Sequence, residues 1–142
     1  MTTYKRLLGI DYGSTRIGVA VSDPLGIIAK GVGVVINGSR MLDELKGYIR
    51  TYEISTAVVG MPFNLKGEKG KKAAEVEQFI ERLVHETGIE VIRWDERFTS
   101  QVAHQTLIDM GVKKKKRQGK GQIDEMAAAL ILQSFLDSSK KS

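Results

Sequence analysis

The sequence predicts an α/β fold with the element order βββαβαβαα, in which helices cover both faces of a mixed five-stranded sheet. Three segments rich in β-branched residues follow one another at the start of the chain, which is typical of an antiparallel meander. Two further apolar strands then alternate with helical segments, which is typical of parallel strands joined by right-handed crossovers. The 142 residues suit one domain, predicted over residues 1–138, with a frayed polar tail at 139–142.

The first three strands are predicted at residues 4–11, 16–22 and 27–36. Apolar side chains alternate along the second of them, and valines dominate the third. Turns containing glycine separate the strands, as expected for a meander. Because the first strand begins a hairpin on one side only, we expect it to lie at the centre of the sheet and to pair with the fourth strand on its other side.

A first helix is predicted after Ser39, its expected N-cap, because apolar residues recur there at helical spacing: Leu42, Leu45, Ile49 and Tyr52. The fourth strand is predicted at residues 54–60, and a loop containing proline and glycine at residues 61–70. The second helix has the clearest apolar face in the chain and is expected to end at Gly88; the face consists of Val76, Phe79, Ile80, Leu83 and Val84.

The last elements are a fifth strand at residues 89–95 and two helices. The third helix is expected to be capped by Thr99 or Ser100 and to end at Gly111. A final helix rich in alanine is predicted at residues 122–136.

The net charge of +5 comes from one short segment. Residues 113–120 supply six of the 22 basic side chains, and without them 16 basic residues stand against 17 acidic ones. An otherwise nearly neutral fold with one concentrated basic segment indicates a polyanionic partner such as nucleic acid. A solvated lysine loop without a partner is the alternative. The expected phosphate contacts are Lys113, Lys114, Lys115, Lys116 and Arg117.

The composition argues against several classes of protein. No apolar run approaches the ~20 residues that span a membrane, so no membrane partner is expected. The chain contains no cysteine, which removes disulfides, thiolate zinc sites and cysteine nucleophiles together. We therefore expect a cytoplasmic protein, in which a metal ion would have oxygen or histidine ligands.

Three acidic residues lie at the edges of apolar elements: Asp11 after the first strand, Glu96 after the fifth, and Asp124 at the start of the last helix. Each has an ordinary explanation: Asp11 as a turn residue, Glu96 as an ion-pair partner of Arg97, and Asp124 as a helix cap. Together they indicate a site for Mg²⁺ or Mn²⁺, because an ionised carboxylate beside a core must be paired or bound to metal. Three such carboxylates can hold ions that hydrolyse a phosphodiester bond.

Helical spacing places Asp124 on the same face as Ala127, Ala128 and Ile131, so we expect this acid to point toward the sheet. The alanines are expected to let the helix approach closely. Asp95 and Glu96 compete for the ligand position, because adjacent strand residues face opposite sides. The greater reach of glutamate favours Glu96.

Two aromatic residues lie close to these acids in the sequence, Tyr12 and Trp94. Each could stack on a nucleic-acid base. Packing in the core is the favoured interpretation for Trp94.

Four segments in their order resemble the YqgF/RuvX family: residues 8–13 (LGIDYG), 58–62 (VVGMP), 94–99 (WDERFT) and 123–128 (IDEMAA). The resemblance spans nearly the whole chain. It implies a ribonuclease-H-like fold and a nuclease, described both as a Holliday junction resolvase and as processing the 5′ end of precursor 16S ribosomal RNA. It also implies that the three acids bind metal, and that Ser14, Thr15, Arg16 and Arg97 lie close to substrate phosphate.

The residues themselves do not choose between precursor ribosomal RNA and branched DNA. We rank ribosomal RNA first, because a small domain with one basic loop need not bind a four-way junction symmetrically. A monomer or weak homodimer is expected. Two other classes remain open, namely a non-catalytic nucleic-acid-binding module and a phosphotransferase, since residues 11–15 also resemble a kinase phosphate loop; the chain is short for the latter.

Overall fold

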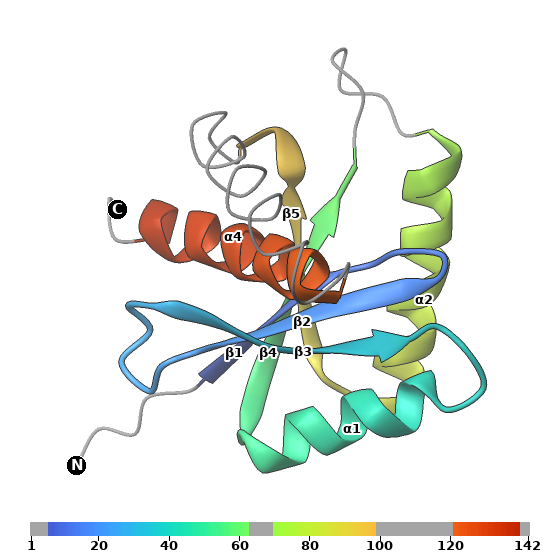
Figure 1. Ribbon diagram of the computed structural model, residues 1–142, viewed down its shortest axis with the longest axis horizontal. Helices are drawn as coiled ribbons and strands as arrows, with labels where there is room; N and C mark the ends of the chain where they lie inside the picture. The colour runs from blue at the N-terminus through green and yellow to red at the C-terminus, as the bar shows by residue number, and fades with distance from the viewer. Residues whose placement is uncertain (1–5, 63–69, 99–120, 140–142) are drawn as a thin grey trace.

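The computed structural model describes residues 6–62, 70–98 and 121–139, and Figure 1 shows its arrangement. The elements in chain order are β1 (Arg6–Asp11), β2 (Arg16–Ser22), β3 (Ala29–Ile36), α1 (Met41–Thr51), β4 (Ile54–Met61), α2 (Lys71–Thr87), β5 (Glu90–Asp95), the short 3₁₀ helix η1 (Glu96–Phe98) and α4 (Gly121–Ser139). The predicted third helix and the basic segment lie outside the described residues.

The five strands form one sheet in the order β3-β2-β1-β4-β5. β1 pairs antiparallel with β2 and parallel with β4, so the first strand is central, as the sequence predicts. β3 continues the antiparallel meander on one side, and β5 pairs parallel with β4 on the other. The predicted fold class, a mixed five-stranded α/β sheet, is confirmed.

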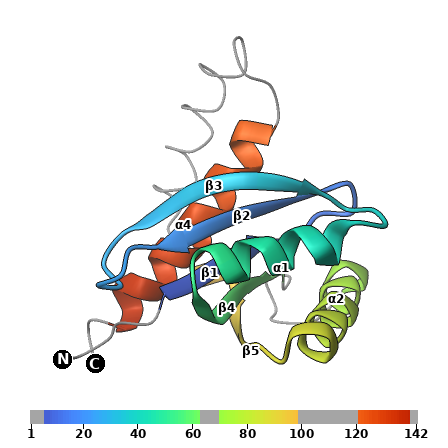
Figure 2. The same ribbon diagram turned by 90° about the horizontal axis from the view of Figure 1, so that it is seen from below.

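The two faces of the sheet bury separate cores. Figures 1 and 2 show that α1 and α2 cover one face and α4 the other. One core lies beneath α1 and α2 and includes Leu8, Ile10 and Val59 from the central strands. The other lies beneath α4, where Ala20 and Val58 meet the apolar side of the helix. Because side chains alternate along a strand, Asp11 shares the α4 face with Leu7 and Gly9.

Glycines of the sheet allow α4 to approach its surface closely. A Cβ atom added at Gly18 would collide with the backbone oxygen of Asp124. A Cβ at Gly31 would lie 2.9 Å from the oxygen of Glu125, and one at Gly9 would lie 2.7 Å from Cβ of Leu132. From the sequence, this close approach was attributed to the alanines of the helix. The glycines of the strands, which have no side chain to obstruct the helix, are required as well.

Several predicted ends of elements need correction. Ser39 does not cap α1, since the N-cap is Arg40 and no side-chain cap is formed. β3 begins at residue 29 and not 27, because the carboxylate of Asp23 accepts the N–H groups of Ile27 and Ile28 and extends the turn. α4 continues through Ser139, three residues past the predicted end of the last helix at residue 136.

The predicted end of α2 is confirmed. Gly88 adopts a left-handed conformation (φ 69°) and donates its N–H to the carbonyl oxygen of Val84. A residue with a side chain is strained in this conformation, so glycine is the expected residue here.

Within residues 6–62, 70–98 and 121–139, no helix is long and apolar enough to span a bilayer.

Candidate active site

Asp11 ends the central strand and points to the α4 face between two glycines. Its direct partner on β2 is Gly18. On the other side Ile10 pairs with Val59, so the parallel register places Asp11 beside Gly60. Because both neighbours lack a side chain, groups from other elements can approach this carboxylate from each side.

Glu96 occupies the space above Gly60. A Cβ atom at Gly60 would lie 2.7 Å from Oε1 of Glu96, which shows that this side chain folds back from η1 over β4. Asp95 instead binds Arg97: its two carboxylate oxygens accept from Nε at 3.1 and 3.0 Å, and Oδ2 accepts from Nη2 at 2.6 Å. The geometry thus favours Glu96 over Asp95 as the acid facing Asp11.

Asp124 reaches the same site from the first turn of α4 and forms an ion pair with Arg16. Nε of Arg16 donates to Oδ2 of Asp124 at 2.6 Å. The two side chains are 34% and 24% exposed, so the pair lies at the mouth of the site and not in the core. Arg16 is the first residue of β2, and the β1–β2 turn separates it from Asp11 along the chain.

The electrostatics of Asp11 show that the three acids converge. Burial, and then the nearby carboxylates of Glu96 and Asp124, raise the pKa of Asp11 from 3.8 to about 7. Lys72 at the start of α2 acts in the opposite direction. A buried carboxylate whose ionisation is opposed by two other carboxylates is an environment in which a divalent cation is strongly stabilised.

A metal-binding arrangement is incomplete as the side chains stand. No group of three acidic or histidine side chains among the residues described could hold a metal ion. The donor types nonetheless suit a hard cation with oxygen ligands, and Asp124 is turned toward Arg16. We infer that Asp11, Glu96 and Asp124 fit a divalent ion after Asp124 leaves the arginine.

The remaining predicted contacts fall into three groups. Ser14 and Thr15 are exposed in the β1–β2 turn, where the side chain of Asn37 donates to the oxygen of Gly13 at 2.9 Å and its backbone N–H donates to the oxygen of Thr15. Arg97 is exposed and bound to Asp95. The basic residues 113–117 lie outside the described part of the chain.

The two aromatic candidates are both packing residues. Tyr12 is partly buried and packs against Phe79 of α2 with ring centroids 4.7 Å apart, and its stacking on a base stays a prediction. Trp94 packs edge-on against Phe135 at 5.5 Å, and its indole N–H donates to Ser134. For Trp94 the favoured interpretation, core packing, is confirmed.

Sequence reasoning missed Lys72 and the two glycines beside Asp11. The first turn of α2 contains no acidic residue and holds Lys72 instead, although cations are disfavoured at a helix N-terminus. This unfavourable placement is the signal that could have identified Lys72. Gly18 and Gly60 carry no comparable signal, because their importance depends on which strands are neighbours.

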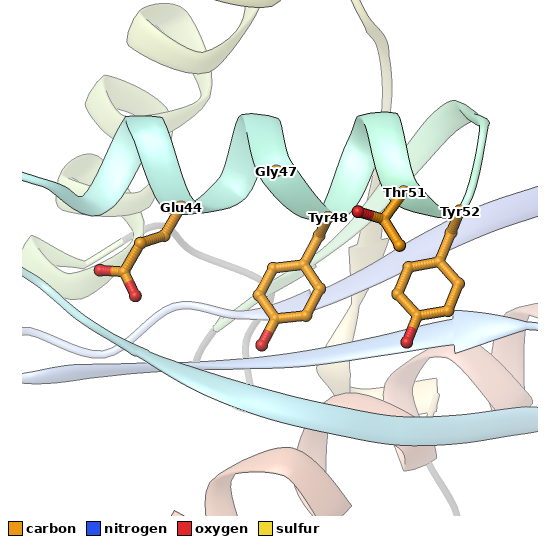
Figure 3. A pocket seen from close by; sticks show the side chains of 5 residues that line it. All are labelled: Glu44, Gly47, Tyr48, Thr51 and Tyr52. Carbon is orange, nitrogen blue, oxygen red and sulfur yellow. The ribbon is translucent and has the colours of Figure 1, made fainter.

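A groove of about 310 Å³ runs along α1 and is separate from the acids (Figure 3). It lies on the opposite side of the sheet from α4. Tyr48 and Tyr52 line it with nearly parallel rings, 6.4 Å apart, together with Glu44, Gly47 and Thr51. Arg6 lies over the Tyr52 ring at 5.1 Å, so the tyrosines are already engaged within the fold.

Asp95 is expected to position Glu96, because it accepts the backbone N–H of Arg97 at 2.9 Å and thereby fixes the first turn after β5. Asp95→Asn should lower kcat for cleavage about tenfold, as outer-shell changes around metal ligands do, with KM within about threefold. Steady-state kinetics checks this. Glu77→Gln is the matched control, since Glu77 pairs with Arg93 of the same strand; equal losses in both variants would contradict the positioning role.

The fold is similar to that of solved Holliday junction resolvases. Thermus thermophilus RuvC in complex with a Holliday junction substrate matches with a TM-score of 0.66 at 13% identity, covering 98% of this chain and 97% of that one. Fowlpox virus resolvase, in a complex with Holliday junction DNA, matches with a TM-score of 0.57 at 14% identity, covering 94% and 98%. At these identities the comparison establishes the fold.

The chain belongs to the RuvX family, whose model is described as "Holliday junction resolvase" and matches residues 5–138. A relative from Sulfurihydrogenibium sp. (strain YO3AOP1) is 42% identical over 134 residues, covering 93% of this chain and 90% of the relative. One from Listeria innocua is 43% identical over 136 residues, covering 93% and 97%. Both are named "Putative pre-16S rRNA nuclease". The predicted family is confirmed, and with it the class of activity, a nuclease.

Proposed function

We propose that this protein is a nuclease that hydrolyses phosphodiester bonds with a divalent metal ion held by Asp11, Glu96 and Asp124. The observation that carries this proposal is the convergence of the three acids, expressed in the pKa of Asp11 near 7. Buried like charges destabilise a fold unless a ligand compensates them. Membership of a nuclease family supports a divalent cation as that ligand.

The chain's own residues have separate tasks in this reaction. The three acids hold Mg²⁺ or Mn²⁺, both of which prefer oxygen ligands. The bound ion supplies activation of water and stabilisation of the leaving oxygen. Arg16, Arg97 and the exposed hydroxyls of Ser14 and Thr15 bind phosphate groups of the nucleic acid around the site. Lys72 adds positive charge on the α2 side.

We propose precursor 16S ribosomal RNA as the substrate, and this choice is supported by the names of full-length relatives at about 40% identity. Branched DNA is the second candidate, favoured by the description of the family model and by the junction bound to the RuvC neighbour. A cytoplasmic protein that acts as a monomer or weak homodimer is part of the same proposal.

A panel of substrates tests the proposal. Precursor 16S RNA, an unrelated single-stranded RNA and a four-way DNA junction are each incubated with Mg²⁺, with Mn²⁺ and with EDTA. We expect metal-dependent cleavage of the precursor in preference to the other two. Preferential cutting of the junction would support the second candidate. The absence of cleavage from every substrate with either metal would indicate a non-catalytic binding module.

The basic segment is expected to bind phosphate. Replacing Lys113, Lys114, Lys115, Lys116 and Arg117 by glutamine should weaken RNA binding and reduce the slope of log K against log salt, because fewer counterions are released. Loss of all five contacts to single-stranded RNA lowers that slope by about 3.5. Fluorescence anisotropy across a salt series measures it. An unchanged slope would show that these side chains are solvated and bind no phosphate.

A further inference from the structure

We propose that Arg16 is an exchangeable counter-ion of Asp124. In the metal-free protein it neutralises this acid, and when a metal ion takes Asp124 the guanidinium transfers to a phosphate of the nucleic acid. Metal and nucleic acid would then each favour the binding of the other. The inference rests on the proposed function and adds a positioning residue that couples the two ligands.

The ion pair holds the carboxylate of Asp124 against Arg16, although Asp124 is close enough to Asp11 to oppose its ionisation. Its single bond, Nε to Oδ2, is 2.6 Å long and bridges the start of β2 and the first turn of α4. With a third to a quarter of each side chain exposed, an entering ion can reach it and the arginine can leave. Partly exposed ion pairs of this kind are weak enough to be displaced by a divalent cation.

A tight turn fixes the backbone before Arg16, whereas the side chain must break only its bond to Asp124 in order to turn. A Cβ at Gly13 would collide with the oxygen of Arg16, so the turn that precedes it is tight. Asn37 clamps this turn through hydrogen bonds to Gly13 and Thr15. The guanidinium can therefore move from Asp124 to a nearby phosphate by a change of side-chain rotamer, while the sheet stays in place.

The terminal N–H donors of the Arg16 guanidinium are not used by the ion pair with Asp124. Within the described ranges, the side chain of Arg16 makes no hydrogen bond other than that from Nε to Asp124. Arginine carries five N–H donors in a planar fork that matches phosphate oxygens. The terminal nitrogens are therefore available to a phosphate at the mouth of the site.

The charges facing this region explain the exchange. The carboxylates of Glu96 and Asp124 disfavour ionisation of Asp11, and Lys72 favours it. With Arg16 included, three carboxylates face two cations. A divalent ion compensates the acids better than a single guanidinium and releases it. Because coupling between two ligands is reciprocal, phosphate that draws Arg16 away must strengthen metal binding by the same factor.

Calorimetric titration with Mg²⁺ alone provides the first test. Arg16→Gln removes the competing cation, so this variant should bind Mg²⁺ about fivefold more tightly than wild type, at the low end of coupling between sites. Lys72→Gln is the matched control, since it removes the same charge near Asp11 without releasing Asp124, and its affinity should change less than twofold. Equal or weaker binding by Arg16→Gln, or equal tightening in both variants, would overturn the proposal.

The second test measures the coupling itself with a single-stranded RNA and Ca²⁺, an oxygen-seeking cation, after the RNA is checked on a gel to be intact. In wild type, Ca²⁺ should raise RNA affinity about fivefold, and RNA should raise Ca²⁺ affinity equally. In Arg16→Gln both factors should fall to about one. A fivefold increase in Arg16→Gln, as in wild type, would overturn the proposal.

A measurement on wild type covers the case in which Arg16→Gln does not fold. The Nε–H signal of Arg16 in a ¹⁵N spectrum should be protected from exchange without metal, and lose that protection as Mg²⁺ is added. A signal unchanged at saturating Mg²⁺ overturns the exchange of partners. If wild type binds no divalent ion in calorimetry, the proposed metal-dependent function fails as well, so the two failures are distinguishable.

Discussion

Asp11→Asn is expected to abolish cleavage and yet to stabilise the metal-free protein above pH 7. Loss of a central metal ligand should reduce the rate by at least about a hundredfold, since the ion supplies several kcal/mol of charge stabilisation. The gain in stability has a separate cause. Asparagine has nearly the same shape as aspartate, but it carries no charge that must be buried between Gly18 and Gly60.

The pH dependence of this gain follows from the pKa of Asp11, which is 3.8 in an unfolded chain and about 7 in the fold. Below pH 4 both states hold the proton and Asp11 imposes no penalty. Between pH 4 and pH 7 the unfolded chain ionises first, so wild-type stability falls as the pH rises. Above pH 7 the penalty is complete and amounts to at most about 4 kcal/mol.

Thermal melts of wild type and Asp11→Asn in EDTA, from pH 4 to pH 8.5, measure the effect. The stabilities should coincide at the acid end and separate toward pH 8. Added Mg²⁺ should then raise the melting temperature of wild type much more than that of the variant. A variant less stable than wild type at pH 8 in EDTA would contradict the crowding of three acids.

Gly18→Ala is expected to destabilise the fold by about 2–3 kcal/mol and to abolish cleavage. The new methyl group would collide with the backbone oxygen of Asp124, and the contact involves backbone that cannot turn aside as a side chain can. α4 must therefore shift away from the sheet or the strand must bend, at the cost typical of overpacking. Either shift moves Asp124 away from Asp11.

Gly47→Ala is the control for this variant. A Cβ at Gly47 meets nothing within 4 Å, and the position lies inside α1. Alanine there should stabilise the protein by up to about 1 kcal/mol, because it restricts the unfolded chain and favours the helix. Urea unfolding and cleavage assays of both variants give the comparison. Wild-type activity in Gly18→Ala would show that the distance of α4 from the sheet is unimportant.

The order of the strands was predictable because it depends on local patterns and on a few rules of connection. The hairpin of β1 with β2 left one side of β1 open, and the crossover through α1 returns to that side. The end of α2 was predictable for a similar reason, since Gly88 is the residue that tolerates a left-handed conformation. The start of β3 was not, because the carboxylate of Asp23 stabilises a longer turn than its Pro-Leu-Gly sequence suggests.

The proximity of the three acids was predictable from their position at the ends of apolar elements, but their partners were not. Which arginine meets which acid depends on contacts between distant parts of the chain. Sequence proximity suggested Arg97 for Glu96, whereas Arg97 binds Asp95. Nothing local connects Arg16 with Asp124, so this ion pair becomes visible only in three dimensions.

The ion pair between Arg16 and Asp124 joins residues 108 positions apart, and this separation affects when the enzyme becomes active. During synthesis, β1, β4 and η1 leave the ribosome with two of the three acids well before α4. Until α4 emerges, Ala20 and Val58 on its face of the sheet have no cover, and Gly18 has nothing to pack against. The third acid arrives together with the helix that completes this core. If the three acids act together as proposed, a nascent chain whose α4 has not yet emerged lacks one of them and is expected to be inactive.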